Sequence, residues 1–208
     1  MARYLVGPYN NTWDFMPAYE KAQDGDTIEF EDGYHFKWPT DKEILIKKSL
    51  NFVGRMVPNP NGNGVLYSNV IKASIKIASQ VKVTFENLWF TINGHYSAIQ
   101  VLEGAEVNCK QVHFEIAIEQ NNKLDILVDS HSKMIMENVD MTTPENHNTM
   151  IKISSSELSI TNSTILARVY VREGSKISLD KVSLQKYNGN AMDVSDSEVT
   201  VKNCTIEG

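Results

Sequence analysis

Acidic and basic side chains alternate with apolar ones in three short segments of the second half of the chain. They are "DILVD" at 125–129, "IKI" at 151–153 and "RVYVR" at 168–172. Carboxylates such as Asp125 and Asp129 are the oxygen ligands that Ca²⁺ prefers, and a Lys or Arg side chain can take part in proton transfer. The basic residues Lys152, Arg168 and Arg172 would lie close to these carboxylates if one scaffold holds the three segments together.

Internal repetition predicts such a scaffold. Six segments share one alternating pattern with a polar residue at a fixed place: "VTFENLWF", "VNCKQVHF", "MIMENVDM", "LSITNSTI", "ISLDKVSL" and "VTVKNCTI". The fixed place is held by Asn87, Gln111, Asn138, Asn162, Lys181 and Asn203, at intervals of 24, 27, 24, 19 and 22 residues. From the second segment onward, another short alternating run precedes each one, such as "AIQVLEG" or "RVYVREG". Each unit is therefore predicted to hold three short strands.

Strict alternation of apolar and polar residues is typical of strands with one buried face. No helical segment of about 10 to 15 residues separates the units, which excludes βαβ crossovers. Asn tolerates the left-handed backbone conformation, so it can turn a tight corner between strands. The repeat therefore predicts an all-β fold, a parallel β-helix of about seven coils. An antiparallel sandwich is the alternative, and the fixed register of the repeat disfavours it.

Two segments depart from the repeat. The stretch "TWDFMPAYEKAQ" at 12–23 is amphipathic and is predicted to be a helix that caps the first coil, whose apolar residues and open strand edge need cover. The stretch at 55–70 is rich in Pro, Asn and Gly, and it is predicted to be an inserted loop. Residues 1–208 are expected to form a single domain.

The N-terminal part carries a resemblance to a known group. The stretch "AYEKAQDGDTIEFEDGYH", followed by "ILIKKSLNFVG", resembles the opening of right-handed parallel β-helix proteins of the pectin-lyase-like superfamily. With the repeats, the resemblance covers nearly the whole chain and implies a right-handed coil. It fixes no function, because that superfamily includes lyases, hydrolases, esterases, tailspikes and modules with no known catalysis.

The resemblance implies roles for the charged residues if the chain is an enzyme. A lyase on uronic acid polymers needs carboxylates to hold Ca²⁺ and an Arg or Lys to remove the sugar C5 proton. Asp125 and Asp129 would then bind Ca²⁺, and Lys152, Arg168 and Arg172 would serve the proton transfer.

The catalytic motifs of the known enzymes of the superfamily are missing. The sequence lacks the polygalacturonase-like set of Asn-Thr-Asp, Asp-Asp, Gly-His-Gly and Arg-Ile-Lys, of which "NGHYS" supplies only a Gly-His pair. It also lacks the Arg-x-Pro-x-x-Arg of pectate lyases and the downstream motif of pectinesterases. The absence of all these motifs favours a scaffold over an enzyme.

The register of the repeats assigns outward positions on the first strand of each coil. One predicted column holds Gln100, Leu127, Lys152, Tyr170 and Asp193; its neighbour holds Leu102, Asp129, Ser154, Arg172 and Ser195, with Asp125 and Arg168 on the flank. Asp125, Asp129, Tyr170 and Asp193 are the expected ligand contacts on this surface. The plainer alternative, which mixed charges favour, is a solvated mosaic that keeps an exposed sheet soluble.

Trp89 shares an outward column of the third strand with His113 and Asp140. An exposed Trp beside polar groups can stack on a sugar ring, so Trp89 is a further candidate for binding. The favoured interpretation instead places Trp89 under the 55–70 insertion. The five histidines show no spacing typical of metal ligands.

Composition excludes some partners. The net charge is −6 and the chain has only four arginines, so a nucleic-acid partner is not expected. No window approaches the roughly 18 apolar residues of a membrane span. No signal peptide is visible, so a cytoplasmic protein is expected, or a secreted one if a signal has been removed. The two cysteines, Cys109 and Cys204, take inward positions and are expected to be free, buried thiols.

We therefore expect a non-catalytic recognition or scaffold module that binds a protein or glycan and needs no cofactor. The alternative is a Ca²⁺-dependent lyase acting on acidic polysaccharide. The last coil keeps the ordinary repeat pattern up to Gly208 and has no capping segment. We expect the chain to be the N-terminal part of a longer protein, with this coil covered by a following domain or another subunit.

Overall fold

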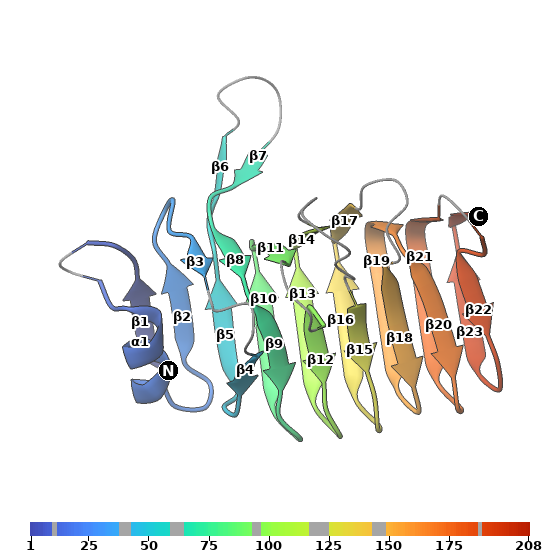
Figure 1. The fold of residues 1–208 in the computed structure, drawn as a ribbon, viewed down its shortest axis with the longest axis horizontal. Coiled ribbons are helices and arrows are strands. Elements are labelled where there is room, and N and C mark those ends of the chain that lie inside the picture. Colours follow the sequence, from blue (N-terminus) through green and yellow to red (C-terminus); the bar gives the residue numbers. More distant parts are fainter. Residues whose placement is uncertain are drawn as a thin grey trace.

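The computed structural model describes residues 1–9, 12–37, 43–58, 65–92, 97–116, 125–142, 149–186 and 189–208. The described chain is mostly β, with one helix near the N-terminus. Its strands run side by side along an elongated body, with the N-terminal helix at one end and the C-terminus at the other (Figure 1).

Two parallel sheets make up the body. The 7-stranded sheet contains the first strand of each unit: β4 (Glu43–Ile46), β9 (Ser74–Ile77), β12 (Ile99–Val101), β15 (Asp125–Val128), β18 (Met150–Ser154), β20 (Arg168–Arg172) and β22 (Met192–Val194). The 15-stranded sheet begins with β1 (Arg3–Val6), β2 (Thr27–Phe30), β5 (Leu50–Val53), β10 (Lys82–Glu86), β13 (Glu106–Lys110), β16 (Lys133–Glu137), β19 (Glu157–Leu166), β21 (Lys176–Gln185) and β23 (Glu198–Lys202). It also holds β3 (Phe36–Lys37), β8 (Val70–Lys72), β11 (Trp89–Ile92), β14 (His113–Ile116), β17 (Asp140–Thr142) and β24 (Thr205–Glu207).

Equivalent strands of successive units pair in parallel. For example, β10 pairs with β13, β13 with β16 and β16 with β19, each with the residues of the repeat in register. The stack is therefore solenoid-like, and the expectation of an all-β fold with parallel strands is confirmed. In the described repeats the antiparallel sandwich is excluded.

The corner positions have the predicted backbone conformation. Asn87, Gln111, Asn138, Asn162, Lys181 and Asn203 all have positive φ, at 56°, 51°, 54°, 50°, 56° and 53°. Asn occupies four of these positions because its short polar side chain tolerates the left-handed region better than most side chains. In β19 and β21 the strand continues through the corner, so two predicted strands become one 10-residue strand.

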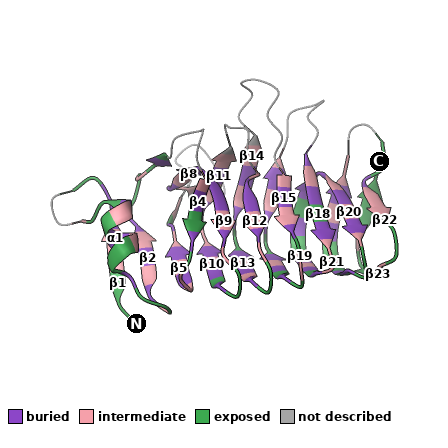
Figure 2. Cartoon of the chain, turned by 60° about the horizontal axis from the view of Figure 1, so that its bottom comes forward, coloured by how far each residue is buried: buried purple, intermediate pink, exposed green. Residues whose placement is uncertain are grey.

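The core fills the space between the sheets. Buried and more exposed residues alternate along the strands (Figure 2). Inward aromatic rings contact one another from unit to unit, with centroids 5.4 Å apart for Phe52 and Phe85 and 5.3 Å apart for Phe90 and Phe114. Cys109 is fully buried and free, as expected. Cys204 is also free, but it is only partly buried, because its unit has no further unit stacked on it among the described residues.

Helix α1 covers the first strands of the stack. It spans Phe15–Lys21, shorter than the predicted 12–23, because Thr12 bonds to the backbone of Tyr9 and Ala22 already leaves the helical conformation. The Phe15 ring lies 4.2 Å from that of Phe36, 6.1 Å from Phe30 and 6.2 Å from Phe52, measured between centroids. The helix therefore shields the aromatic core at this end.

The 55–70 segment contains structure that the loop prediction missed. Strands β6 (Met56–Pro58) and β7 (Val65–Tyr67) form an antiparallel hairpin that rises from the stack (Figure 1). Residues 59–64 lie outside the described residues. Three-residue strands are too short for a visible alternation, so Pro, Asn and Gly dominated the prediction.

Candidate functional site

The predicted outward column of the first strands is confirmed by the strand register. Neighbouring positions in the sheet are Gln100, Leu127, Lys152, Tyr170 and Asp193, in that order. Parallel strands in a sheet lie about 4.8 Å apart, so these side chains form a row along the stack. The flanking residues Asp125 and Arg168 lie two strands apart, with Met150 between them.

Arg168 and Arg172 both bind the carboxylate of Asp193. Nη2 of Arg168 lies 3.2 Å from Oδ2, and Nη2 of Arg172 lies 3.0 Å from Oδ1. Arg172 also donates from Nη1 to the carbonyls of Val171 and Asp193. Asp193 therefore bridges the two guanidinium groups and fixes their positions on the sheet.

The ring of Tyr170 lies between these arginines in the sequence and contacts both. The guanidinium carbon of Arg168 is 4.5 Å from the ring centroid, and that of Arg172 is 5.6 Å away. Both distances are within the range of cation–π attraction, about 6 Å. A sugar that stacks on this ring would have to compete with the guanidinium groups, so the ring edge and hydroxyl are the better contacts for a ligand.

Positive charge accumulates at one end of this row. Asp193 is shared by two arginines, and Lys186 adds a third cation near Arg168. Burial and the nearby charge of Arg168 lower the pKa of Lys186. Because Arg168 and Arg172 share one carboxylate, the group keeps a positive charge that can attract an anionic group.

The other two predicted ligands do not form a shared cation site. Asp125 lies 3.5 Å from Nζ of Lys152, whereas Asp129 lies four residues further along the chain. Four residues of strand span roughly 13 Å, while oxygens on one Ca²⁺ lie within about 5 Å of each other. Across the described ranges, no group of three or more His, Cys, Asp or Glu side chains gathers around a possible metal position.

A hollow of about 340 Å³ lies over the first-strand sheet. Four predicted residues line it: Asp129, Lys152, Tyr170 and Arg172. Its other polar side chains, Gln100, Ser154 and Glu173, and the apolar Leu127 were not predicted as contacts. Glu173 has positive φ in the turn after β20 and accepts a hydrogen bond from the Ser154 hydroxyl. The turn sequence "REG" directly after the predicted strand could have indicated that Glu173 lies beside the outward column.

Trp89 lies apart from this hollow, on β11 of the other sheet. Its ring centroid is 5.4 Å from that of His113, whose Nδ1 lies 3.1 Å from Oδ2 of Asp140. Tyr67 of the hairpin lies 6.0 Å from His113 on a nearly parallel plane, and burial together with the charge of Asp140 raises the pKa of Tyr67.

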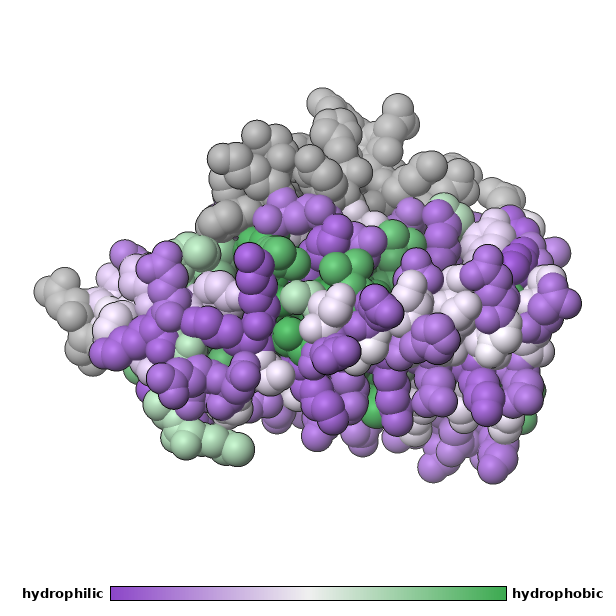
Figure 3. Space-filling view, turned by 90° about the horizontal axis from the view of Figure 1, so that it is seen from below, coloured by the Kyte–Doolittle hydropathy of each residue, from purple (hydrophilic) through white to green (hydrophobic). Residues whose placement is uncertain are grey.

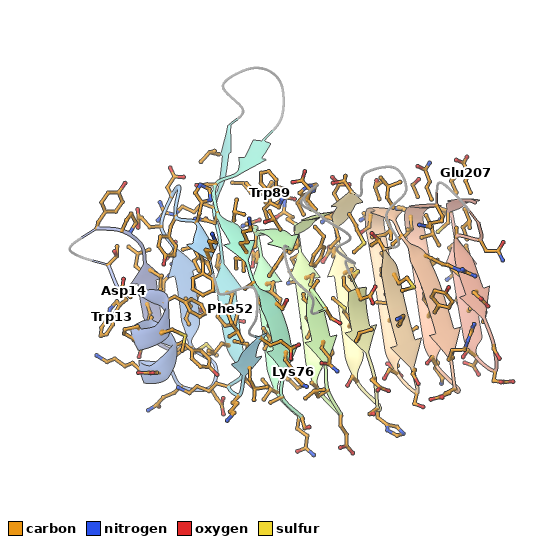
Figure 4. All side chains as sticks on the ribbon, viewed as in Figure 1. Trp13, Asp14, Phe52, Lys76, Trp89 and Glu207 are labelled. Carbon is orange, nitrogen blue, oxygen red and sulfur yellow. The ribbon has the colours of Figure 1, made fainter. Side chains whose placement is uncertain are left out.

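Trp89 lies near the base of the hairpin (Figure 4), and its indole nitrogen is buried. The described structure therefore supports the interpretation that this Trp lies beside the 55–70 segment. The interpretation as a sugar platform gains no support from this environment.

The rest of the described surface is mostly polar. Hydrophilic side chains cover most of the described surface in the view from below (Figure 3). None of the helical residues that the structure describes forms a segment long and apolar enough to cross a membrane.

Neither the comparison with protein-family models nor the search of curated proteins finds a match for this chain.

Proposed function

We propose that this chain is a right-handed parallel β-helix that acts as a non-catalytic recognition module for a glycan with acidic groups. The glycan binds over β12, β15, β18 and β20. The observation that carries the proposal is the hollow beside Tyr170 and Arg172, which combines apolar surface with two cations, Lys152 and Arg172, and two carboxylates, Asp129 and Glu173.

The chemistry of the hollow suits a sugar. Sugar rings present hydroxyl groups at their edges and C–H groups on their faces, and specific small-molecule sites combine apolar surface with a few placed polar groups. Leu127 and the Tyr170 edge offer apolar contact, while Gln100, Lys152 and Glu173 offer hydrogen bonds. The positive charge around Asp193 adds attraction for a carboxylate or sulfate.

The ion pairs favour binding over catalysis. Arginine stays protonated in proteins, so Arg168 and Arg172 would need a strongly altered environment to accept a proton. Their partner Asp193 instead stabilises the charged guanidinium groups. Lys152 is likewise engaged by Asp125 at 3.5 Å. A Ca²⁺-dependent lyase would need these groups to be arranged around a cation and a substrate proton.

Binding to a panel of acidic and neutral polysaccharides tests the proposal. We expect affinity for at least one acidic polymer, with about tenfold weaker binding for Arg172→Ala and for Lys152→Gln, since a charged hydrogen bond contributes roughly 1.5 kcal/mol or more. Lys37→Ala, an exposed residue on β3 outside the hollow, is the matched control. Equal losses in all three variants, or no binding by the natural chain, would reject the site.

The last unit offers a second contact surface. Val194, Val201 and Ile206 are 42%, 44% and 43% exposed, although equivalent residues of earlier units are buried. Exposed apolar patches mark interaction sites, so we propose that another subunit covers them. A hydrophobic dye should bind this surface, and Val201→Ser with Ile206→Ser should abolish its fluorescence. Unchanged fluorescence in that variant would place the apolar surface elsewhere.

A further inference from the structure

Two rows of alternating charge run along the outer face of the second strands, on β10, β13, β16, β19, β21 and β23. The first residues of these strands form one row: Lys82, Glu106, Lys133, Glu157, Lys176 and Glu198. The fifth residues form the other row: Glu86, Lys110, Glu137, Thr161, Asp180 and Lys202. These are called the first and second charge rows.

Alternation inside each row has an explanation within one chain. Opposite charges on directly neighbouring strands attract, and like charges there are destabilising. Lys82 lies 3.3 Å from Glu106, and Lys176 lies 3.8 Å from Glu198. Alternation in either row therefore stabilises the stack, whatever the order of charges in the other row.

The relation between the two rows needs a different explanation. Five of the six strands carry opposite charges at their first and fifth residues, and β19 has the neutral Thr161 at its fifth. The first and fifth residues of a strand are roughly 13 Å apart, beyond the Debye length of about 8 Å at physiological salt. If both rows had the same order of charges, the attraction between neighbouring strands of one chain would be equally strong.

The opposite order makes this face complementary to itself. When two copies meet face to face around a two-fold axis parallel to the stack, the first row of one copy meets the second row of the other. Lys82 then faces Glu86, Lys133 faces Glu137, and every charged pair of the two rows has opposite signs. Rows in the same order would bring like charges together in this arrangement.

The residues between the rows allow a close approach. This middle row is mostly small and polar, and its side chains are exposed or partly exposed: Thr84, Asn108, Ile135, Ser159, Ser178 and Thr200. A shallow hollow of about 280 Å³ lies along it, lined by Ser159, Ser178 and Thr200 among others. Ile135 is the one large side chain of the described middle row, and it is partly buried, so the row leaves room for a close approach.

We infer that this face binds a second copy of the same chain, side by side and with the two stacks parallel. The inference goes beyond glycan recognition and does not depend on it, because the face belongs to the other sheet. The first five residues of the six strands cover an area of roughly 29 by 17 Å, about 500 Å² per copy. That is near the lower limit for specific interfaces, so the dimer is weak and sensitive to salt. Pairing doubles the glycan sites and raises avidity.

Sedimentation equilibrium at about 0.01 M and about 1 M salt tests the inference, since the Debye length falls from about 30 Å to 3 Å over this range. We expect a concentration-dependent dimer at low salt and a monomer at high salt. Lys133→Glu, which places like charges opposite Glu137 of the other copy, should weaken the dimer at least about tenfold. A monomer under all conditions would overturn the inference.

The exchange variant Lys133→Glu with Glu137→Lys separates association from stability. It restores opposite charges between parallel copies, but it places like charges next to each other within both rows of one chain. We expect the dimer to recover while the melting temperature falls below that of the single variant. If the dimer stays weak in the exchange variant, the parallel arrangement is wrong. Lys152→Glu, on the other sheet, is the control and should leave the dimer unchanged.

Discussion

Single residues at the corners decide whether the chain can turn from one strand to the next. Asn138 is exposed, has a φ of 54° and donates its backbone N–H to the carbonyl of Thr161 on the next unit. Its backbone conformation, rather than its side-chain contacts, explains why Asn recurs at this place. The positive φ at Gln111 and Lys181 shows that longer side chains adopt the conformation as well, held by the same stack.

Replacing Asn138 by a β-branched residue should therefore be costly. We expect Asn138→Val to lower the free energy of unfolding by about 1–2 kcal/mol, the usual strain of a left-handed backbone. Asn138→Gly should have a much smaller effect, because glycine adopts positive φ without strain. Urea denaturation of both variants measures the difference. Equal losses in both would show that side-chain bonds of Asn138 matter more than its φ.

The candidate site was predictable at the level of columns and not of contacts. A period of two residues places Lys152, Tyr170 and Asp193 on one face, and the repeat aligns them across the strands. Which charges pair is set by side-chain rotamers, so the bridge from Asp193 to both arginines had no sequence signal. The contacts of Tyr170 were not predictable either. Because its ring contacts both guanidinium groups, it is less suited to stack on a sugar than a free tyrosine ring would be.

At the scale of elements, helix α1 depends on one aromatic anchor. Phe15 is only 5% exposed and contacts three aromatic rings of the first strands. We expect Phe15→Ala to lower the free energy of unfolding by about 3–5 kcal/mol, as other deletions of buried rings do. Lys21→Ala on the same helix removes a cation–π contact with Trp13 and should cost less than about 1 kcal/mol. Thermal or urea unfolding compares the two variants, and similar losses would contradict the anchoring role.

The connection from α1 to β2 should make stability dependent on pH. The Asp26 carboxylate accepts hydrogen bonds from the backbone N–H groups of Gln23 and Ala2, which hold its pKa below the ordinary value for Asp. Because the folded pKa is the lower one, the contribution is complete above the unfolded pKa of about 3.9 and disappears as the pH falls through the folded pKa.

Comparison with Asp26→Asn measures this contribution. The Asn side chain has one carbonyl oxygen and cannot accept both hydrogen bonds as the carboxylate does. The natural chain should therefore be more stable than the variant at pH about 7 and lose this advantage as the pH falls through the lowered pKa of Asp26. Urea titrations at several pH values give the difference. A stability gap that stays constant with pH would mean that the charge of Asp26 contributes nothing.

Long, periodic elements were predictable, whereas short ones were not. The strands around Asn87, Asn138 and Asn162 follow from alternation over five or more residues. The β6–β7 hairpin was missed because its strands have three residues each, and α1 was predicted too long because an amphipathic pattern does not mark where the backbone leaves the helix. Trp89 could be placed beside His113 on a column, and the strand register agrees, but the contact of Tyr67 with His113 depends on the hairpin.

At the scale of the whole molecule, the parallel stack turns single residues into rows. Each unit contributes one strand to each surface, so a residue type repeated in the sequence becomes a line about 4.8 Å per step along the body. The first-strand face holds the hollow with Lys152 and Arg172, and the second-strand face holds the two charge rows. The proposed glycan site and the proposed contact with a second copy therefore occupy different sheets of one rigid stack.

A ¹H–¹⁵N NMR titration of the chain with an acidic oligosaccharide tests the central claim most directly. We expect the largest shift changes in backbone amides of β12, β15, β18 and β20 around Leu127, Ser154 and Glu173, with the sugar spectrum free of olefinic signals with or without Ca²⁺. Shift changes confined to other strands would contradict the binding face. New olefinic signals that require Lys152 or Arg172 would contradict the non-catalytic role and establish a lyase.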